Sequence, residues 1–403
     1  MPIYTRCIQP QSIDPILFTN REDEYHHIKE ILRSIIRARG EAERRLLIHG
    51  DRGTGKSILL RKVLSDLKQE IDFIPVIVDG KTSRNAEELL RDICENLASE
   101  LRDEYEGDEK VIREISYLDE ISRVSTVTKG WARSRAEEIE ATEGAEIGIH
   151  GFFKLKMGIG GKETGTEELT RNVEIEIDSR FLRQLLSQVI ETVSADRDKE
   201  VVIAIDGLDQ IHDKAQIAEF VHEIFKYRKS LIIAVLRSEA ITPEFHRSFR
   251  DTIVVKDLSG DALRAILDRR IENCPEKEIL DQRLTPLADK LRTITANPFS
   301  FLTWVHFLCT NTELNPETML DDLKGFVSNF YGFDPEKASV ISKFFMNKGN
   351  PFLTREKIVD PKNISDEDYE TMIENGILVP DNLYNERKKY RLSPDLAFFK
   401  LDM

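Results

Sequence analysis

The sequence predicts an α/β fold: a core with a parallel sheet, followed by a helical unit and a small C-terminal unit. Three observations predict this fold. A glycine-rich loop lies between an apolar strand and an amphipathic helix at residues 46–67. Apolar strands then alternate with helical patterns up to residue 255, a rhythm typical of a parallel sheet with helices on both faces. From residue 257 the apolar spacing is helical, and two short strands come near the end.

Composition places the chain among globular proteins without a membrane segment. Of its 403 residues, 40% are hydrophobic and 33% are charged, and no apolar run approaches the roughly 20 residues of a membrane span. The net charge of −15 disfavours a protein that coats nucleic acid by bulk attraction. The N-terminus lacks a secretory pattern, and the four cysteines form no C-x-x-C pair, which is typical of thiols in a reducing compartment. We therefore expect a cytoplasmic protein.

The first helix is predicted within residues 16–39. Asn20 is a suitable helix cap, and the acidic first turn, Glu22 to Glu24, suits the positive end of the helix dipole. Arg21 stands at the start of this helix. From the residues alone, Arg21 is an ordinary surface arginine.

The loop after the first strand carries the strongest functional signal. The apolar run 46–48 leads into the pattern G-x-x-x-x-G-K-[ST], the P-loop, and a helix follows. Glycines let the backbone turn its N–H groups toward phosphate oxygens, and the helix N-terminus adds partial positive charge. Lys56 is expected to reach the β- and γ-phosphates, and Ser57 to bind Mg²⁺. The nucleotide-binding residues expected here are Gly50, Asp51, Arg52, Gly53, Thr54, Gly55, Lys56, Ser57 and Ile58.

Two further strands are expected to present functional side chains at their carboxyl ends. Residues 201–205 form an apolar strand that ends in Asp206, where a carboxylate beside the P-loop can hold Mg²⁺. Asp209 either polarises the attacking water or caps a helix. Residues 231–236 form another strand, and Arg237 at its end can face the γ-phosphate. The other core elements are predicted as strands at 73–79 and 252–255 and helices at 86–101 and 181–193.

Residues 102–178 do not follow the strand–helix rhythm and are predicted as an insertion. The charged stretch 104–140 is expected to be helical. Residues 144–163 are rich in glycine and alternate apolar with other residues, and alternation returns at 173–177, which favours a β-hairpin. This hairpin is either a plain surface loop or a protrusion that contacts a partner subunit or a ligand.

The second half of the chain is predicted as two helical units. Ser259 is a suitable cap for the first helix of a lid, whose later helices lie at 284–294 and 299–309, punctuated by Asn297 and Pro298. The last unit has helices at 335–345, 355–359 and 365–375, then strands at 376–379 and 388–392, the order of a winged helix with a two-stranded wing. The predicted domains are therefore a core at 1–256, a lid at 257–330 and a winged helix at 331–403.

Together these motifs resemble the P-loop ATPases of the AAA+ and STAND group, including relatives near origin-initiator ATPases. Residues 50–57 match their Walker A motif and residues 201–206 their Walker B motif. The resemblance implies that FTNREDE at 18–24, with Arg21, lies near the adenine. It also implies that Asn297 and Pro298 form an element of the lid, with Pro298 at the ATP site, and that Arg237 is the sensor-1 residue.

The resemblance further implies an arginine finger and a slow reaction. Arg250, and alternatively Arg247, stands where AAA+ proteins carry an arginine that reaches a neighbour's nucleotide. Gly207 follows Asp206 where most AAA+ motors have a catalytic glutamate, and no arginine stands at the lid element. Both departures suit slow hydrolysis by a switch better than a fast motor.

The main functional hypothesis is therefore a cytoplasmic ATP-driven switch that binds ATP, ADP and Mg²⁺. ATP would favour a homo-oligomer, and the winged helix or the insertion hairpin would contact a protein partner. Two alternatives stay open. One is a DNA-binding initiator, loader or transposition-regulator ATPase, which would bind through the basic wing, although the helix at 364–375 is acidic. The other is a nucleotide-stabilised scaffold that does not hydrolyse ATP. The basic residues of the wing are Arg387, Lys388, Lys389 and Arg391.

Overall fold

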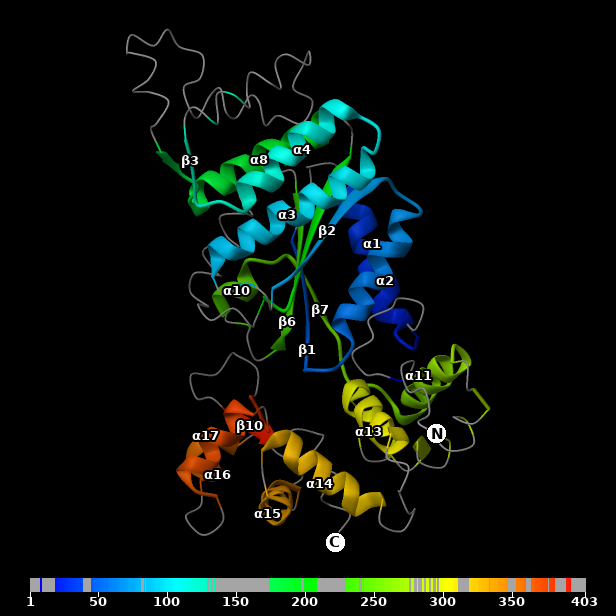
Figure 1. Ribbon diagram of the computed structural model, residues 1–403. Helices are drawn as coiled ribbons and strands as arrows, with labels where there is room; N and C mark the ends of the chain where they lie inside the picture. Colours follow the sequence, from blue (N-terminus) through cyan, green and yellow to red (C-terminus); the bar gives the residue numbers. More distant parts are fainter. Residues whose placement is uncertain are drawn as a thin grey trace.

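A computed structural model of the chain (Figure 1) shows an α/β core, a helical segment that is called the lid below, and a small C-terminal unit. It describes residue 8, then 19–38, 45–80, 85–128, 174–196, 199–208, 230–238, 243–274, 297–310, 319–332, 334–346, 353–359, 364–375, 377–380 and 389–392, and the single positions 83, 131, 134, 241, 277, 278, 281, 285, 288, 289, 291, 292 and 295. The predicted hairpin at 144–163 and Asp209 lie outside the described residues.

The core is built on a five-stranded sheet in the order β2-β5-β6-β1-β7, in which every neighbouring pair is parallel, as predicted. Apolar, β-branched runs form these strands because both faces of the sheet are covered. In this order β1 lies between β6 and β7, and β6 separates it from β5. The strands are β1 (Arg45–Gly50), β2 (Phe73–Asp79), β5 (Glu200–Asp206), β6 (Ser230–Arg237) and β7 (Asp251–Val254).

Two hydrophobic clusters cover the two faces of the sheet. Alternate residues of β1 divide between them: Leu46 and Ile48 face one cluster and Leu47 faces the other. The first cluster is closed by α1 (Glu22–Arg37) and α2 (Lys56–Lys68). The helices that close the second are α3 (Ala86–Glu104), α4 (Glu109–Ser122) and α8 (Ser179–Asp196), and Figure 1 shows these two groups on opposite sides of the sheet.

The insertion differs from the prediction of a helix over 104–140. Helix α4 ends at Ser122, and β3 (Thr126–Thr128) pairs antiparallel with β4 (Glu174–Glu176). The β-branched run at 126–128 favours a strand. Arg91 holds the end of α4 and the ends of the β3–β4 pair together. Its guanidinium donates to the carbonyl oxygens of Ser122, Val124 and Ile177 at 3.0, 2.7 and 2.7 Å.

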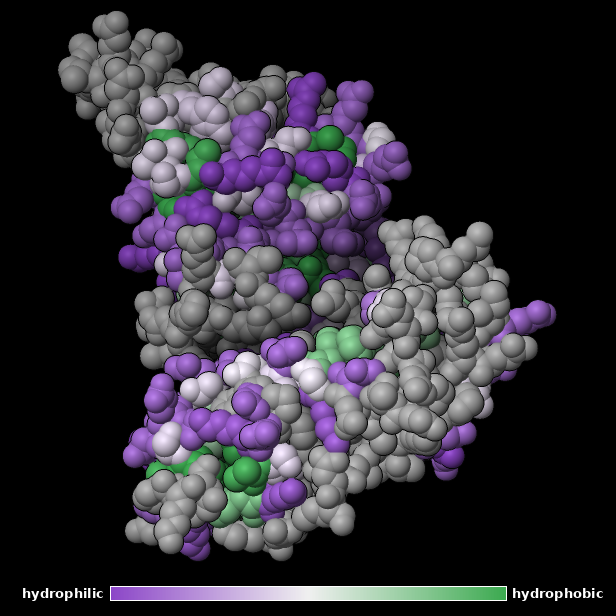
Figure 2. All heavy atoms as spheres, turned by 60° about the horizontal axis from the view of Figure 1, so that its bottom comes forward, coloured by the Kyte–Doolittle hydropathy of each residue, from purple (hydrophilic) through white to green (hydrophobic). Residues whose placement is uncertain are grey.

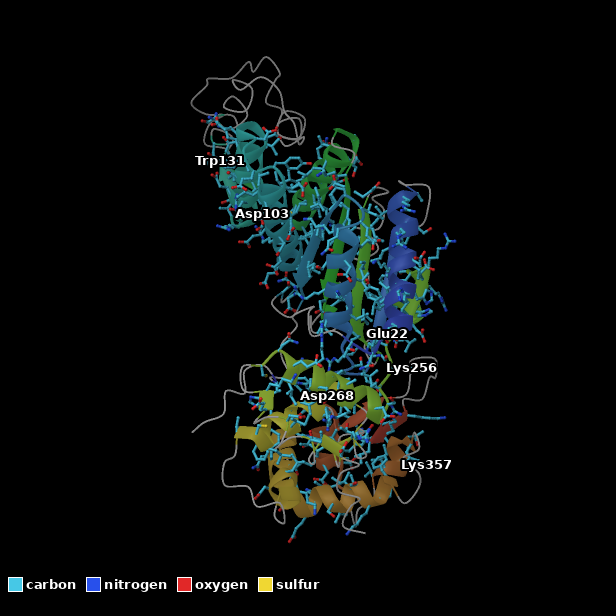
Figure 3. All side chains as sticks on the ribbon, turned by 90° about the vertical axis from the view of Figure 1, so that its right-hand side faces the viewer. Glu22, Asp103, Trp131, Lys256, Asp268 and Lys357 are labelled. Atoms are coloured by element: carbon cyan, nitrogen blue, oxygen red, sulfur yellow. The ribbon has the colours of Figure 1, made fainter. Side chains whose placement is uncertain are left out.

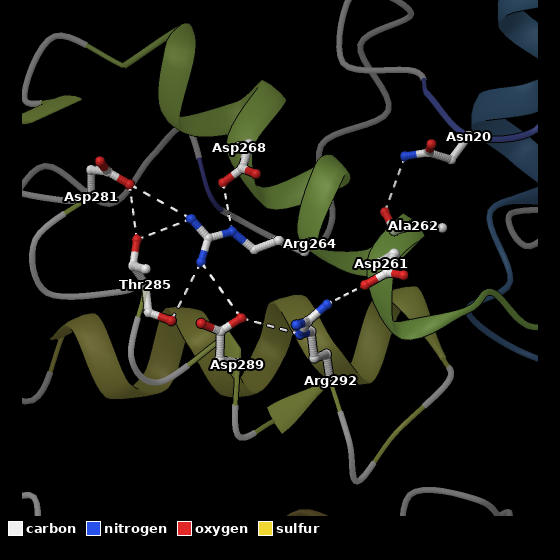
Figure 4. Close-up of polar contacts among 9 residues, drawn as sticks. All are labelled: Asn20, Asp261, Ala262, Arg264, Asp268, Asp281, Thr285, Asp289 and Arg292. Atoms are coloured by element: carbon white, nitrogen blue, oxygen red, sulfur yellow. Dashed lines mark hydrogen bonds and ion pairs between the residues drawn. The ribbon is translucent and has the colours of Figure 1, made fainter.

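The lid consists of α11 (Gly260–Glu272), α13 (Pro298–Thr310) and α14 (Met319–Tyr331). The Ser259 hydroxyl caps α11 by accepting from the Ala262 N–H, as predicted. Ion pairs tie α11 to the segment that follows it (Figure 4). Arg264 contacts Asp268, Thr285, Asp281 and Asp289, and Arg292 contacts Asp261 and Asp289.

The C-terminal unit follows the order predicted for a winged helix but has a three-stranded sheet. The two-residue strand β8 pairs with β10, which also pairs with β9, all antiparallel. A strand of two residues is too short to show alternation, so it could not be predicted from the pattern of residues. The unit comprises α15 (Pro335–Met346), β8 (Leu353–Thr354), α16 (Arg355–Ile358), α17 (Asp366–Glu374), β9 (Leu378–Pro380) and β10 (Lys389–Leu392).

The lid and the C-terminal unit share one hydrophobic cluster, which is separate from the two clusters of the core. Ile8 is buried in this shared cluster, so the chain reaches the lid before it enters the core. Cys94 and Cys309 are buried free thiols, whereas Cys274 is disulfide-bonded, so the expectation of free thiols is wrong at Cys274.

Hydrophilic residues cover most of the described surface seen in Figure 2. The large hydrophobic side chains exposed in the described part are Val124, Val254 and Val340. Among the described helices, none has the length and apolar character to cross a membrane.

Candidate nucleotide-binding site

The P-loop joins the end of β1 to the start of α2, and its glycines are required by geometry. Gly53 and Gly55 have φ angles of 81° and 92°, a left-handed conformation that residues with a Cβ rarely adopt. A Cβ on Gly50 would lie 2.1 Å from the carbonyl oxygen of Val255. The loop therefore turns tightly between strand and helix, in the conformation that a phosphate cradle needs.

Lys56, the first residue of α2, is buried in this loop. Its Nζ donates to the carbonyl oxygens of Gly50 at 3.0 Å and Asp51 at 2.7 Å. The amine thus lies inside the curve of the loop, beside the first N–H groups of α2. A buried cation surrounded by loop backbone at a helix N-terminus is a setting that fits phosphate oxygens.

Ser57, Asp206 and Arg237 all lie at the carboxyl edge of the sheet. Arg237 ends β6 and is paired in register with Gly50. Asp206 ends β5 and is paired with Val235, so one strand separates it from β1. Asp206 is buried and Ser57 is half-buried in the first turn of α2. A hydroxyl and a carboxylate are oxygen donors of the kind that a hard divalent cation prefers.

His49 is a buried neighbour of the loop that sequence reasoning missed. Its Nδ1 lies 2.9 Å from the hydroxyl of Ser238, across the β1–β6 pair. Burial, together with the electrostatic effects of His246 and Lys56 and against the opposing effect of Asp51, lowers the pKa of His49 to about 4. The imidazole is therefore neutral at pH 7. The sequence signal was a lone histidine in an otherwise apolar strand directly before the loop.

Arg21 connects three parts of the molecule and is not the surface arginine that the residues alone suggested. Its side chain is 4% exposed. One guanidinium nitrogen donates to the carbonyl oxygens of Thr54 at 2.5 Å and Lys256 at 2.7 Å. Burial lowers its pKa, against the opposing effect of Glu24. Figure 3 shows Lys256 at the junction of core and lid, close to Glu22 at the start of α1.

Asn20 also contacts the lid, so its prediction as a helix cap was wrong. Arg21 is the residue at the N-cap position of α1, and its side chain makes no capping hydrogen bond. Asn20 adopts a left-handed conformation with φ 62° and donates through Nδ2 to the carbonyl oxygen of Ala262 at 3.1 Å. The bond joins the entry to α1 with α11 (Figure 4).

The lid contacts the P-loop through Asn297, which the resemblance to AAA+ proteins placed with Pro298 in a lid element. Its Nδ2 donates to the carbonyl oxygen of Arg52 at 2.8 Å, while its Oδ1 accepts from the N–H groups of Phe299 and Ser300. The Phe299 N–H also donates to the carbonyl oxygen of Gly53 at 3.2 Å. These bonds place Pro298, the buried first residue of α13, next to the loop.

The structure places the arginine-finger candidates away from this P-loop. Arg247 and Arg250 are exposed, and Arg250 directly precedes Asp251, which pairs with Leu46 near the start of β1. The P-loop follows the other end of β1. Of the basic wing, Arg387 and Lys388 lie outside the described residues. Lys389 and Arg391 lie on β10, and Arg391 Nη2 is 3.2 Å from Asp51 Oδ2 in the P-loop.

Several solved structures resemble the chain at low identity. Cdc6p from Pyrobaculum aerophilum is 12% identical, with a TM-score of 0.46, and the match covers 99% of this chain and 98% of that one. Orc1 from Aeropyrum pernix in complex with DNA is 13% identical, with a TM-score of 0.47 and coverage of 98% and 96%. Drosophila ORC bound to DNA is 12% identical, with a TM-score of 0.47 and coverage of 99% and 90%. These likenesses are distant.

A family profile gives a more direct assignment. No curated protein matches the chain significantly. The profile of the family described as "AAA ATPase domain" matches residues 17–233, more than half of the chain. This stretch contains the first helix, the P-loop and the Asp206 strand described above. The chain therefore belongs to the AAA ATPase domain family, and it is a P-loop ATPase with a parallel α/β core.

Proposed function

We propose that the protein is a slowly hydrolysing ATP switch, in which nucleotide state sets the arrangement of core, lid and C-terminal unit. One observation carries the proposal. Three separate parts of the molecule bond to the P-loop: α1 through Arg21, the lid through Asn297, and β10 through Arg391. A ligand bound to the loop therefore has a different affinity for different arrangements of these parts. This difference in affinity is what lets the ligand shift the population from one arrangement to another.

Within this proposal, each P-loop residue has a defined role. The N–H groups of the loop and Lys56 bind the phosphates of ATP or ADP, and Ser57 and Asp206 hold Mg²⁺. The metal would polarise the phosphate oxygens and neutralise developing charge. Arg237 lies level with Gly50 at the sheet edge, where its charge can stabilise the γ-phosphate. Asp209 is proposed to orient the attacking water.

Slow hydrolysis follows from the residue after Asp206. Gly207 has a φ of 77°, and its N–H donates to the carbonyl oxygen of Val235 at 2.9 Å. A glutamate in this conformation would be strained, and glycine offers no carboxylate to activate water. The ATP-bound state would then be long-lived, as a switch requires.

The test compares wild-type protein with Lys56→Ala and Asp206→Asn. Lys56→Ala should weaken ATP and ADP binding by a factor of about 100 or more, because it removes the cation that contacts the phosphates. Asp206→Asn should keep nucleotide binding in the absence of Mg²⁺ and lose most Mg²⁺-dependent phosphate release. Calorimetry and a phosphate-release assay measure the two effects.

The outcomes of this test separate the switch from a scaffold. Hydrolysis by Lys56→Ala at the wild-type rate would contradict the assignment of the site. If the wild type binds ATP tightly but shows no measurable turnover, the protein is instead a scaffold that does not hydrolyse ATP.

The contacts of the described residues count against binding of the C-terminal unit in a groove of DNA. Helix α17 exposes Asp366, Glu367 and Glu370, and Arg355 is paired with two of them at 2.9 and 3.3 Å. Carboxylates oppose the phosphates of DNA. We therefore propose a protein partner for this unit, in preference to DNA.

A further inference from the structure

The ion pair between Arg391 and Asp51 brings the C-terminal unit to the nucleotide site. Along β10, Tyr390 and Leu392 are buried in the cluster shared with the lid, so Lys389 and Arg391 lie on the other face of the strand. From this face, Arg391 Nη2 reaches Asp51 Oδ2 at 3.2 Å, although 340 residues separate the two in the chain. Figure 1 shows β10 on the side of the C-terminal unit that is turned toward the core.

Asp51 poses an electrostatic problem for a phosphate site. It is the second residue of the loop, and its backbone carbonyl accepts from Lys56 Nζ at 2.7 Å, so its backbone lies beside the amine proposed to bind phosphate. A negative side chain here repels the phosphates that the loop must bind. Lys56 is committed to the phosphates, and a second cation is needed to compensate the carboxylate.

Arg391 is placed to be that cation. Its side chain is 32% exposed and that of Asp51 is 28% exposed, so salt and water screen the pair only in part. Arg391 is also the one wing residue that the described part of the chain shows bonded to the P-loop.

We propose that Arg391 is a positioning residue for nucleotide binding: it holds and neutralises the Asp51 carboxylate, so docking of the C-terminal unit makes the P-loop receptive to phosphates. The inference rests on the proposed nucleotide-binding function and adds a regulatory input to it. Because coupling is reciprocal, nucleotide binding stabilises the docked C-terminal unit. A partner that pulls β10 away from the loop lowers the affinity for ATP and ADP.

The test is calorimetric titration of the full chain with ADP and with a non-hydrolysable ATP analogue. Arg391→Ala should weaken binding by about 5- to 20-fold, the effect of one uncompensated charge at short range. Asp51→Asn removes only the carboxylate charge and leaves the loop backbone in place, so it should bind at least as tightly as the wild type. The double variant Asp51→Asn/Arg391→Ala should stay within about twofold of Asp51→Asn, and Arg391→Lys should recover most of the loss. The matched control is Lys389→Ala, which removes the same charge from the same face of β10.

Salt supplies a second readout that loss of packing would not reproduce. The difference between wild type and Arg391→Ala should shrink as ionic strength rises from about 0.05 to 0.5 M, because the charge effect is screened. Thermal unfolding of each variant checks that it is folded at the titration temperature.

Three results would overturn the inference. Tighter binding by Arg391→Ala would make the contact inhibitory. A loss no larger than that of Lys389→Ala would remove any specific role, and an equal loss in the Asp51→Asn background would show that Arg391 does not act through Asp51. Wild-type protein that binds no more nucleotide than Lys56→Ala would instead overturn the proposed function itself.

Discussion

His49 is a buried neutral side chain among charged groups at the P-loop, and it makes the stability of the folded protein sensitive to acid. Its pKa of about 4 in the folded protein lies below the ordinary value of 6.5. Between these two values the unfolded chain binds more protons than the folded protein. The stability that neutral His49 contributes is therefore present above pH 6.5 and is lost as the pH falls toward 4.

We expect the melting temperature of the wild type to fall more steeply from pH 7 to pH 5 than that of His49→Gln, which cannot acquire a proton in this range. Thermal unfolding followed by circular dichroism at each pH measures the difference. His27→Gln is the control, because His27 is exposed on α1. If His49→Gln and the wild type show parallel pH dependence, burial of neutral His49 does not contribute to acid sensitivity.

At the same scale, the sequence located the residues of the loop but not the residues that hold it. The spacing of Gly50, Gly55 and Lys56 is local, and a local pattern is visible in a sequence. Arg21 and Asn297 contact the loop from 33 and 245 residues away along the chain. Which residues become such partners depends on how whole helices and strands pack together. The spacing of residues along the sequence does not show this packing. The resemblance to AAA+ proteins pointed to Arg21 and to the Asn297–Pro298 element, and nothing pointed to the Arg391–Asp51 pair.

At the scale of elements, the lid rests directly on one glycine of the P-loop. A Cβ on Gly53 would lie 2.6 Å from Asn297 Oδ1 and 2.6 Å from Phe299 Cβ. The approach of α13 to the loop therefore needs a residue without a side chain at this position. Gly107 offers a matched comparison, because it has a φ of 94° and a Cβ there would have no described atom within 4 Å.

We predict that Gly53→Ala destabilises the protein more than Gly107→Ala. The control should lose only about 1–2 kcal/mol for the left-handed conformation. Gly53→Ala adds a steric clash, so it should lose more and should also weaken ADP binding. Chemical denaturation and calorimetry give both quantities. Equal losses of stability in the two variants would mean that α13 does not press on the loop in solution.

Sequence predicted the regular elements well and the irregular ones poorly. Long amphipathic helices such as α1 and α8 and the buried strands have strong periodicity, and their bounds differ from the prediction by a few residues. The helix expected over 104–140 fails at β3, where three β-branched residues pair with β4. That pairing joins strands more than 40 residues apart, and the helical pattern of α4 gave no sign of where it would stop.

At the scale of the whole molecule, the exposed arginines on the edge away from the P-loop give a test of assembly. Arg250 cannot serve its own P-loop, because β1 runs between them. We expect an ATP analogue, and not ADP, to produce a larger species in size-exclusion chromatography with light scattering. Arg250→Ala should reduce hydrolysis at least about tenfold while nucleotide affinity stays within about twofold.

Arg247→Ala is the companion variant, because Arg247 is the alternative finger on α10 (Pro243–Arg247). A defect in Arg247→Ala alone would transfer the role to that residue. A single species of monomer mass with every nucleotide would exclude a finger in trans and leave a switch within one chain.

The burial of Ile8 in the cluster of the lid and the C-terminal unit has a mechanical consequence. The chain passes from that cluster into the core before α1 and returns to it after β7, and each crossing is bonded, one through Asn20 to Ala262 and the other through Lys256 to Arg21. Two bonded crossings restrict movement of the lid and the C-terminal unit against the core more than a single connection would, and Arg21 links one of these crossings to the P-loop through Thr54.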